Sequence, residues 1–197
     1  MLKRCLDLLL AGLGLLLLAP LFALIALAIK FDSAGPVFFR QERVGRFGKR
    51  FRIHKFRTMQ HAPVDAGAQL TVGADARITR VGALLRNTKL DELPQLIDVL
   101  LGAMSLVGPR PEVPRYVALY PAALRDKVLS VRPGITDPAS IEFRDEAAQL
   151  AHAADPEREY VESILPRKLA LASRYVLTRN FSGDLRLILR TLKALVN

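Results

Sequence analysis

The sequence predicts a predominantly helical α+β fold, made of a membrane-embedded N-terminal segment (residues 1–31) and one compact domain (residues 32–197). Three observations predict it. Residues 8–29 form an uncharged apolar run, residues 35–59 contain two aromatic-rich stretches that favour β-strands, and most of the remaining chain has apolar residues at helical spacing. A chain of 197 residues is long enough for one domain with its own core, and too short for two of ordinary size.

The apolar run spans 22 residues. At about 1.5 Å per residue it can cross the roughly 30 Å hydrocarbon core of a bilayer, and it is too long for the apolar part of a cleavable signal peptide. Basic residues flank both of its ends, and a single crossing would place one basic end outside the cytoplasm. Pro20 lies near the centre, where it removes a helical hydrogen bond and kinks the helix. The run therefore fits a re-entrant helix-break-helix that returns to the cytoplasm, and it also fits a single spanning helix kinked at Pro20.

The formal net charge of +10 indicates an anionic partner, either a membrane surface or a nucleic acid. Nine basic residues lie between positions 30 and 57, directly behind the apolar run, accompanied by two acids. This placement favours an anionic membrane surface, and no recognisable nucleic-acid-binding fold is indicated. Cys5 is the only cysteine, so the chain cannot form an intrachain disulfide.

The domain begins with a predicted β-hairpin, whose two strands are separated by glycines. Strand alternation places Phe51 and Ile53 on one face of the hairpin and Arg52 and His54 on the other. Small and polar residues then predict a mobile loop over residues 60–77.

The rest of the chain is predicted to be mostly helical. The expected helices are residues 77–101 (interrupted near Thr88 and Pro94), 115–130, 142–178 and 184–196. The stretch SLVGPRPEVPRY, residues 105–116, contains three prolines and cannot be regular helix. The last predicted helix has one apolar and one basic face, which fits either a membrane interface or packing on the domain core.

The stretch TKLDELPQLI, residues 88–97, places Asp91 beside Glu92. One interpretation is structural: Thr88 caps a helix together with Asp91, and the helix dipole stabilises acids in the first turn. The other is chemical, because acids among arginines suit a site in which carboxylates hold a divalent cation and guanidinium groups hold phosphate. Capping needs only one acid, and both interpretations stay open from the residues alone.

Other kinds of site lack support in the sequence. The three histidines are scattered without a second ligand at zinc spacing, and no GxxxxGK[ST] or GxGxxG phosphate motif occurs. No serine stands in the GxSxG setting of a nucleophile elbow.

Several ordered motifs resemble those of the bacterial sugar transferases, also called monotopic polyprenyl-phosphate phosphoglycosyl transferases, in their minimal form. The motifs are KRCLD, the apolar run with its central proline, GPVFFRQERVG, FRIHKFRTM, TRVGALLRNTKLDELPQL, MSLVGPRPE and VRPGIT, and they cover nearly the whole chain. The resemblance implies transfer of sugar 1-phosphate from a UDP-sugar to polyprenyl (undecaprenyl) phosphate, with release of UMP, at the start of glycoconjugate assembly.

The resemblance also assigns residues. Asp91 matches the family's nucleophile, which forms a covalent phosphosugar intermediate, and the required Mg²⁺ sits beside this residue. Glu92 matches the assisting partner, for which the role of a base is one suggestion. The residues that match motifs lining the family's site are Lys55, Arg57, Arg86, Arg110 and Glu112.

A further implication concerns location: a monotopic protein of the bacterial inner membrane, with its catalytic domain on the cytoplasmic face and anionic lipid as a partner. Two departures from the family pattern stand out. Ala19-Pro20 replaces the usual Ser-Pro pair at the helix break, and alanine cannot satisfy backbone groups that proline frees. The segment PGITDPASIEFRDE, residues 133–146, also differs and is a candidate for sugar selection.

Two competing hypotheses follow from the same residues. The first is a non-enzymatic membrane adaptor, in which the basic stretch binds lipid and Asp91 merely caps a helix. The second is a membrane-tethered nucleic-acid binder, which the position of the basic residues beside the apolar run disfavours. We therefore expect no nucleic acid partner, and the sequence leaves self-association open.

Overall fold

The computed structural model describes residues 2–60, 73 and 75–196, so most of the loop predicted over residues 60–77 lies outside the described residues. The described chain is mostly helical, as the sequence predicts, and it has two small sheets, of which the sequence predicts only the hairpin. The helices are α1 (Leu2–Asp32), α2 (Arg80–Asn87), α3 (Gln95–Leu100), α4 (Pro114–Val117), α5 (Ala122–Val128), α6 (Pro138–Glu142), α7 (Glu146–Ala151), α8 (Pro156–Glu159), α9 (Leu165–Thr178) and α10 (Phe181–Val196). The strands are β1 (Phe38–Val44), β2 (Arg50–Phe56), β3 (Ser105–Val107) and β4 (Gly134–Thr136). Two 3₁₀ turns, η1 (Arg46–Gly48) and η2 (Leu90–Glu92), and one π-helical turn, η3 (Tyr160–Ile164), complete the set.

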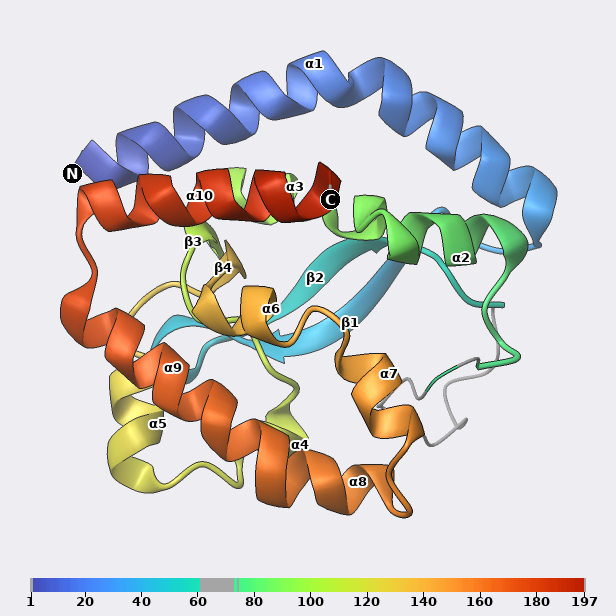
Figure 1. Cartoon of the computed structure of the whole chain (residues 1–197). Coiled ribbons are helices and arrows are strands. Elements are labelled where there is room, and N and C mark those ends of the chain that lie inside the picture. The colour runs from blue at the N-terminus through green and yellow to red at the C-terminus, as the bar shows by residue number, and fades with distance from the viewer. Residues whose placement is uncertain (1, 61–72, 74, 197) are drawn as a thin grey trace.

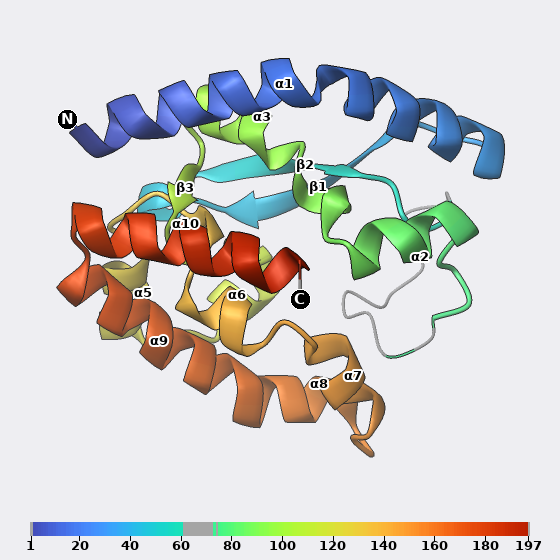
Figure 2. The same ribbon diagram turned by 45° about the horizontal axis from the view of Figure 1, so that its top comes forward.

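The elements form layers. In Figures 1 and 2, α1 runs along one side of the domain, the β1–β2 hairpin lies beneath it, and α9 with α5 lies on the far side of the hairpin. α10 lies along the N-terminal half of α1, and its C-terminal end is near the middle of the molecule in Figures 1 and 2. The domain thus has one side occupied by a long apolar helix.

The predicted hairpin is confirmed. β1 and β2 pair antiparallel, with Phe38 opposite Phe56 and Val44 opposite Arg50. Ile53 is buried and Arg52 is exposed, as alternation predicts. His54 is also largely covered, because its ring nitrogen Nδ1 lies 2.7 Å from a carboxylate oxygen of Asp98 in α3.

α1 continues through Pro20 as one helix, and Figure 1 shows it bent over its middle. The expected break at Ala19-Pro20 therefore does not interrupt the helix. Proline lacks one N–H donor, and the loss of a single bond bends a helix more readily than it ends one when the neighbouring bonds persist.

The N-terminal end of α1 is attached to the domain by polar contacts. Arg4 donates a hydrogen bond of 2.9 Å to the carbonyl of Val99, and Asp7 accepts one of 2.8 Å from the Ser105 hydroxyl. Lys3 forms an ion pair of 2.9 Å with Asp184 at the start of α10.

The C-terminal end of α1 is attached to the same domain. The Arg57 guanidinium donates to the carbonyls of Ser33, Ile29 and Ala34, and the Asp32 carboxylate accepts a 3.0 Å bond from the backbone N–H of Val81. Both ends of α1 therefore lie on one body.

Apolar side chains also attach both halves of α1 to the domain. Ala11 packs in a cluster with Val99 and Met104 under the first half of α1, and Ile25 and Ile29 pack with Phe56 and Leu85 under the second half. The outer side of the helix is not covered. Its exposed large apolar side chains are Leu2, Leu8, Leu9, Leu13, Leu16, Leu17, Leu24, Leu27 and Phe31. This is one helix long and apolar enough to cross a membrane, and most of it is unburied, which indicates membrane association.

Candidate active site

Asp91 and Glu92 lie in η2, the single turn between α2 and α3. The chain enters this turn through Lys89, whose backbone is left-handed with φ of 58°. The predicted Thr88 cap is wrong: Thr88 ends α2, and its hydroxyl donates 2.8 Å to the carbonyl of Leu84 instead of capping a following helix. The turn that holds the acids has no side-chain cap. Two acids at this place thus need a different explanation.

Glu92 is held by two cations. Its carboxylate accepts a 2.7 Å bond from Nζ of Lys55, at the end of β2, and a bidentate interaction from Arg110, in which one nitrogen lies 2.9 Å away. Burial alone raises the pKa of Glu92, but Arg110 and Lys55 outweigh burial and hold that pKa well below its ordinary value of 4.5. Glu92 is therefore a fixed anion whose oxygens are engaged, and it is poorly suited to accept a proton.

Asp91 differs from its neighbour. Its residue is 8% exposed, yet within the described chain its carboxylate receives neither a hydrogen bond nor an ion pair. Burial raises the pKa of Asp91, Lys55 opposes that rise, and the negative charge of Glu92 adds to it. The site therefore contains one largely buried residue whose carboxylate lacks a partner in the described chain, beside a second carboxylate that is fully engaged.

Arg86 supplies further positive charge to Asp91 from α2. Its Nε donates 2.8 Å to the Thr58 hydroxyl. α2 reaches this position because Gly82 packs on the backbone of Thr58, where a Cβ atom would stand 2.0 Å from the Thr58 carbonyl oxygen. A larger residue at 82 would push α2, and Arg86 with it, away from the strand.

Arg110 follows β3 in the proline-rich loop. β3 and β4 pair parallel, and glycines at 108 and 134 let the two backbones meet; a Cβ on Gly134 would stand 2.1 Å from the nitrogen of Gly108. The backbone N–H of Arg110 donates 3.3 Å to Asp137, which also caps α6. The loop is thereby fixed at the edge of the site.

Glu112 is the centre of a second charged cluster. Its carboxylate accepts bonds of 2.7 Å from the Tyr160 hydroxyl and 3.2 Å from Lys168, and Arg43 lies 3.7 Å away. Burial raises the pKa of Glu112, but Lys168 and Arg43 outweigh burial and lower that pKa to about 2. The charge of Arg43 also interacts with that of Glu92, so the cluster around Glu112 and the acid pair influence each other electrostatically.

Sequence reasoning missed Arg43, Lys168 and Tyr160. Lys168 and Tyr160 lie 56 and 48 positions from Glu112 in the chain, and they meet it only because η3 and α9 fold back on the proline-rich loop. Tyr160 lies in a π-helical turn, and such turns often mark functional positions. This turn can be recognised only in the structure.

The predicted site residues fall into three groups. Lys55, Arg86 and Arg110 surround the acid pair, Glu112 stands in the neighbouring cluster, and Arg57 lies elsewhere. The Arg57 guanidinium is directed to the carbonyls at the end of α1. We find no described contact between Arg57 and the acid pair, and its visible role is to attach α1.

The described residues contain no group of three His, Cys, Asp or Glu side chains that could hold a metal ion. Mg²⁺ is commonly held by one or two carboxylates together with substrate phosphates and water, so such an ion does not require a cluster of this kind. Asp91 is the available carboxylate, and the residues present fit such an ion.

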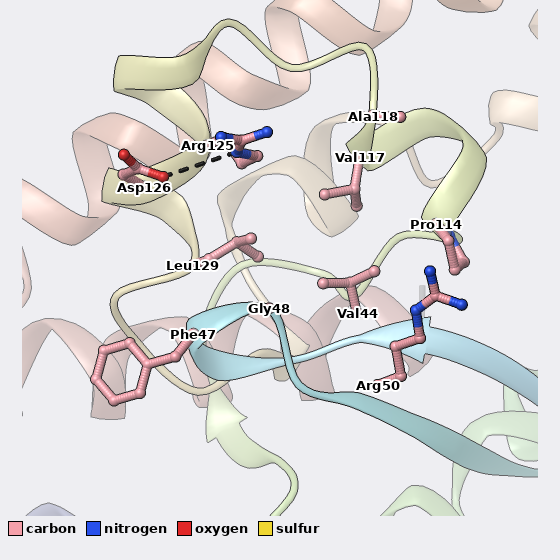
Figure 3. Close-up of a pocket in the computed structure, with 10 residues that line it drawn as sticks. All are labelled: Val44, Phe47, Gly48, Arg50, Pro114, Val117, Ala118, Arg125, Asp126 and Leu129. Carbon is pink, nitrogen blue, oxygen red and sulfur yellow. Dashed lines mark ion pairs between the residues drawn. The ribbon is translucent and has the colours of Figure 1, made fainter.

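One cavity of the described chain lies away from the acid pair. Figure 3 shows it at the tip of the hairpin, where Phe47, Arg50, Arg125 and neighbours enclose about 530 Å³. None of the predicted site residues lines it.

A charged acid pair beside a long exposed apolar helix is the arrangement of a membrane-associated protein with a site suited to phosphate chemistry. The chain matches the family model described as "Bacterial sugar transferase" over residues 1–197 and belongs to that family.

Relatives support the assignment. The chain is 40% identical to the "UDP-glucose:undecaprenyl-phosphate glucose-1-phosphate transferase" of Caulobacter vibrioides over 199 residues, covering 98% of this chain and 69% of the relative. It is 46% identical over 143 residues to the protein with the same description in Escherichia coli strain K12, covering 72% of this chain and 31% of the relative. It is 43% identical over 141 residues to the "UDP-N-acetylgalactosamine-undecaprenyl-phosphate N-acetylgalactosaminephosphotransferase" of Aeromonas hydrophila, covering 71% of this chain and 33% of the relative. The chain thus spans about a third of the length of the last two relatives.

Proposed function

We propose that the protein is a phosphoglycosyl transferase, which moves sugar 1-phosphate from a UDP-sugar to undecaprenyl phosphate and so begins polysaccharide or other glycoconjugate assembly. One observation carries the proposal: of two adjacent acids, Glu92 is neutralised by Lys55 and Arg110, while the buried Asp91 stays without a partner in the described chain. Family membership and the printed activities of the relatives support it.

The proposed first step is attack by an Asp91 carboxylate oxygen on the sugar-bearing phosphorus of the donor. The attack forms an acyl phosphate on Asp91. The bond from the same phosphorus to the bridging oxygen of the diphosphate breaks, and UMP leaves with the electron pair of that bond. In the second step an oxygen of the undecaprenyl phosphate attacks the same phosphorus, and Asp91 is released as a carboxylate. Each step conserves charge without a proton transfer, because the attacking oxygens are already ionised.

The surrounding cations make this attack feasible. A carboxylate that approaches a diphosphate meets like charge, and Lys55, Arg86 and Arg110 offset that repulsion at an enclosed site where their charges are weakly screened. Glu92 assists by holding Lys55 and Arg110 in place, since its low pKa disfavours service as a base. When bound, Mg²⁺ would be held by Asp91 and the substrate phosphates, and it would supply further charge neutralisation.

The proposal extends to the membrane. Because both ends of α1 are attached to one domain while its outer leucines are exposed, we propose that α1 enters one leaflet as a re-entrant, monotopic anchor. The domain then faces the cytoplasm of the bacterial inner membrane. The exposed leucines of α10, at positions 185, 189 and 192, would lie in the interface beside anionic lipid.

The proposal is tested with purified full-length protein in non-ionic detergent, supplied with Mg²⁺, undecaprenyl phosphate and a panel of UDP-sugars. We expect UMP release with a UDP-hexose or a UDP-N-acetylhexosamine, dependent on the lipid phosphate for multiple turnovers. Absence of UMP release with every donor in the panel would overturn the proposed activity. An N-terminal tag labelled from the periplasmic side of intact cells would overturn the re-entrant topology.

A further inference from the structure

A groove between α9 and α10 gathers four arginines from two helices. Its volume is about 300 Å³. Arg174 and Arg179 line it from the α9 side, and Arg186 and Arg190 line it from α10, over an apolar floor that includes Leu171 and Leu187. Arg186 and Arg190 are one helical turn apart and therefore present their side chains on the same face of α10.

These arginines are not balanced by acids of the protein. Asp184 is the acid that lines the groove, and it is already engaged by the Tyr175 hydroxyl at 2.8 Å and by Lys3 at 2.9 Å. Within the described chain none of the four arginines forms an ion pair, whereas Arg158 in α8 and Arg167 near the start of α9 each form one with a glutamate. Like charges this close repel one another, and a bound anion removes that repulsion.

The surroundings of the groove indicate which anion. α10 carries Arg186 and Arg190 on its groove side and exposes Leu185, Leu189 and Leu192 beside them. Guanidinium groups bind phosphate oxygens in bidentate fashion, and leucines next to them suit acyl chains. A soluble phosphate would use only the first of these two features.

The groove is separate from the acid pair. It is lined by the end of α9 and the start of α10, and none of the residues around Asp91 belongs to it. In Figure 2 the start of α10 and the η2 region, which lies between α2 and α3, are at different places along the domain.

We infer that this groove is a binding site for the phosphate headgroup of an anionic phospholipid. The four arginines contact the phosphodiester, and the exposed leucines of α10 contact the chains. Such a site fixes the rotation of α10 about its axis at the membrane, and it is distinct from the acceptor lipid's place at Asp91.

The experiment uses the full chain in non-ionic detergent micelles and isothermal titration calorimetry with dioctanoyl phosphatidylglycerol, dioctanoyl phosphatidylcholine and inorganic phosphate. We expect phosphatidylglycerol to bind at least about tenfold more tightly than the other two probes. The double variant Arg186→Gln/Arg190→Gln should weaken its binding by about tenfold or more, since each surface cation contributes to lipid binding.

The matched control is Arg125→Gln/Arg158→Gln, which removes two exposed cations from α5 and α8, outside the groove, and should change the affinity by less than about twofold. Arg190→Gln alone serves as a milder variant if the double variant unfolds, as thermal melting would show. Equal losses in the two double variants would show a net-charge effect and overturn the site. Equal affinity for phosphatidylcholine or for inorganic phosphate would also overturn it. UMP release measured on the same samples separates this outcome from failure of the proposed activity.

Discussion

Glu92 and Glu112 are both held by cations, but Glu92 is half-buried and Glu112 is buried, and they stand in different surroundings. Glu112 has Lys168, Arg43 and the Tyr160 hydroxyl around it, and its neighbourhood is closed and balanced. Glu92 is equally well held, yet it has Asp91 directly beside it with no partner of its own. The difference separates a cluster that stabilises the fold from one that keeps a reactive group available.

The largest expected effect comes from removing the unpartnered charge. Asp91→Asn should lower the rate of UMP release by about 10⁴-fold or more, because a nucleophile is lost. The melting temperature should stay equal or rise slightly, because burial raises the pKa of Asp91 and so disfavours its ionised form in the folded protein. The rate of UMP release and the melting temperature are measured on the same preparation. Near-wild-type turnover by the Asn variant would contradict the assignment of Asp91.

Glu92→Gln should have the next largest effect. Lys55 and Arg110 lose the anion that holds them, and we expect kcat to fall by about 100-fold. If Glu92 acts by holding these cations, the pH dependence of the remaining activity should keep its wild-type shape. If the variant instead loses one of the pH-dependent changes in activity that the wild type shows, Glu92 acts as a proton acceptor.

Glu112→Gln tests the closed cluster through stability. At neutral pH the free energy of unfolding should fall by about 3 kcal/mol, because Lys168 and Arg43 lose a buried anion. The pKa of Glu112 is about 2 in the folded protein against an ordinary value of 4.5. A carboxyl whose folded pKa is depressed stabilises the fold above its unfolded pKa, and it loses that contribution as pH falls through its folded pKa.

The difference in unfolding free energy between wild type and Glu112→Gln should therefore be complete above about pH 5 and shrink between pH 4.5 and pH 2. Denaturant titrations at a series of pH values measure it. A difference that does not change over this range would show that Glu112 is not the titrating group.

The smallest effect is expected at Lys89, which precedes the acid pair with φ of 58°. Lys89→Gly should leave kcat within about twofold and change the unfolding free energy by less than about 1 kcal/mol, because glycine adopts this backbone freely while the 3.2 Å bond from Lys89 to the Arg144 carbonyl is lost. Lys89→Val is the comparison, and it should destabilise the turn. Equal effects of both substitutions would show that the backbone at 89 does not orient the pair.

Local patterns predicted much of this molecule. Strand alternation placed Ile53 and Arg52 correctly, and the amphipathic segment at the C-terminus is a helix. Arg57 was expected at the site with Lys55 because both match family motifs that line it, whereas β2 ends at Phe56 and the Arg57 guanidinium is directed toward α1. A motif match does not indicate which way each side chain points after the strand ends.

Contacts between distant segments were beyond prediction for a different reason. Thr88 was interpreted as the start of a helix, whereas its hydroxyl bonds backward to Leu84. Tyr160 and Lys168 reach Glu112 only through the path of α9, which depends on packing across the whole domain. The sequence showed that two acids are adjacent. Only the structure shows that the Glu92 carboxylate is held by cations while the Asp91 carboxylate has no partner in the described chain.

The most direct test of the account is to look for the covalent intermediate on Asp91. The full-length protein is incubated with Mg²⁺ and a UDP-sugar labelled at the sugar-bearing phosphate, without undecaprenyl phosphate, and its peptides are examined by mass spectrometry. The account predicts a sugar-phosphate adduct on Asp91, formed with one equivalent of UMP and discharged when the lipid phosphate is added. Turnover without any labelled protein, or the same label on the Asp91→Asn variant, would contradict it.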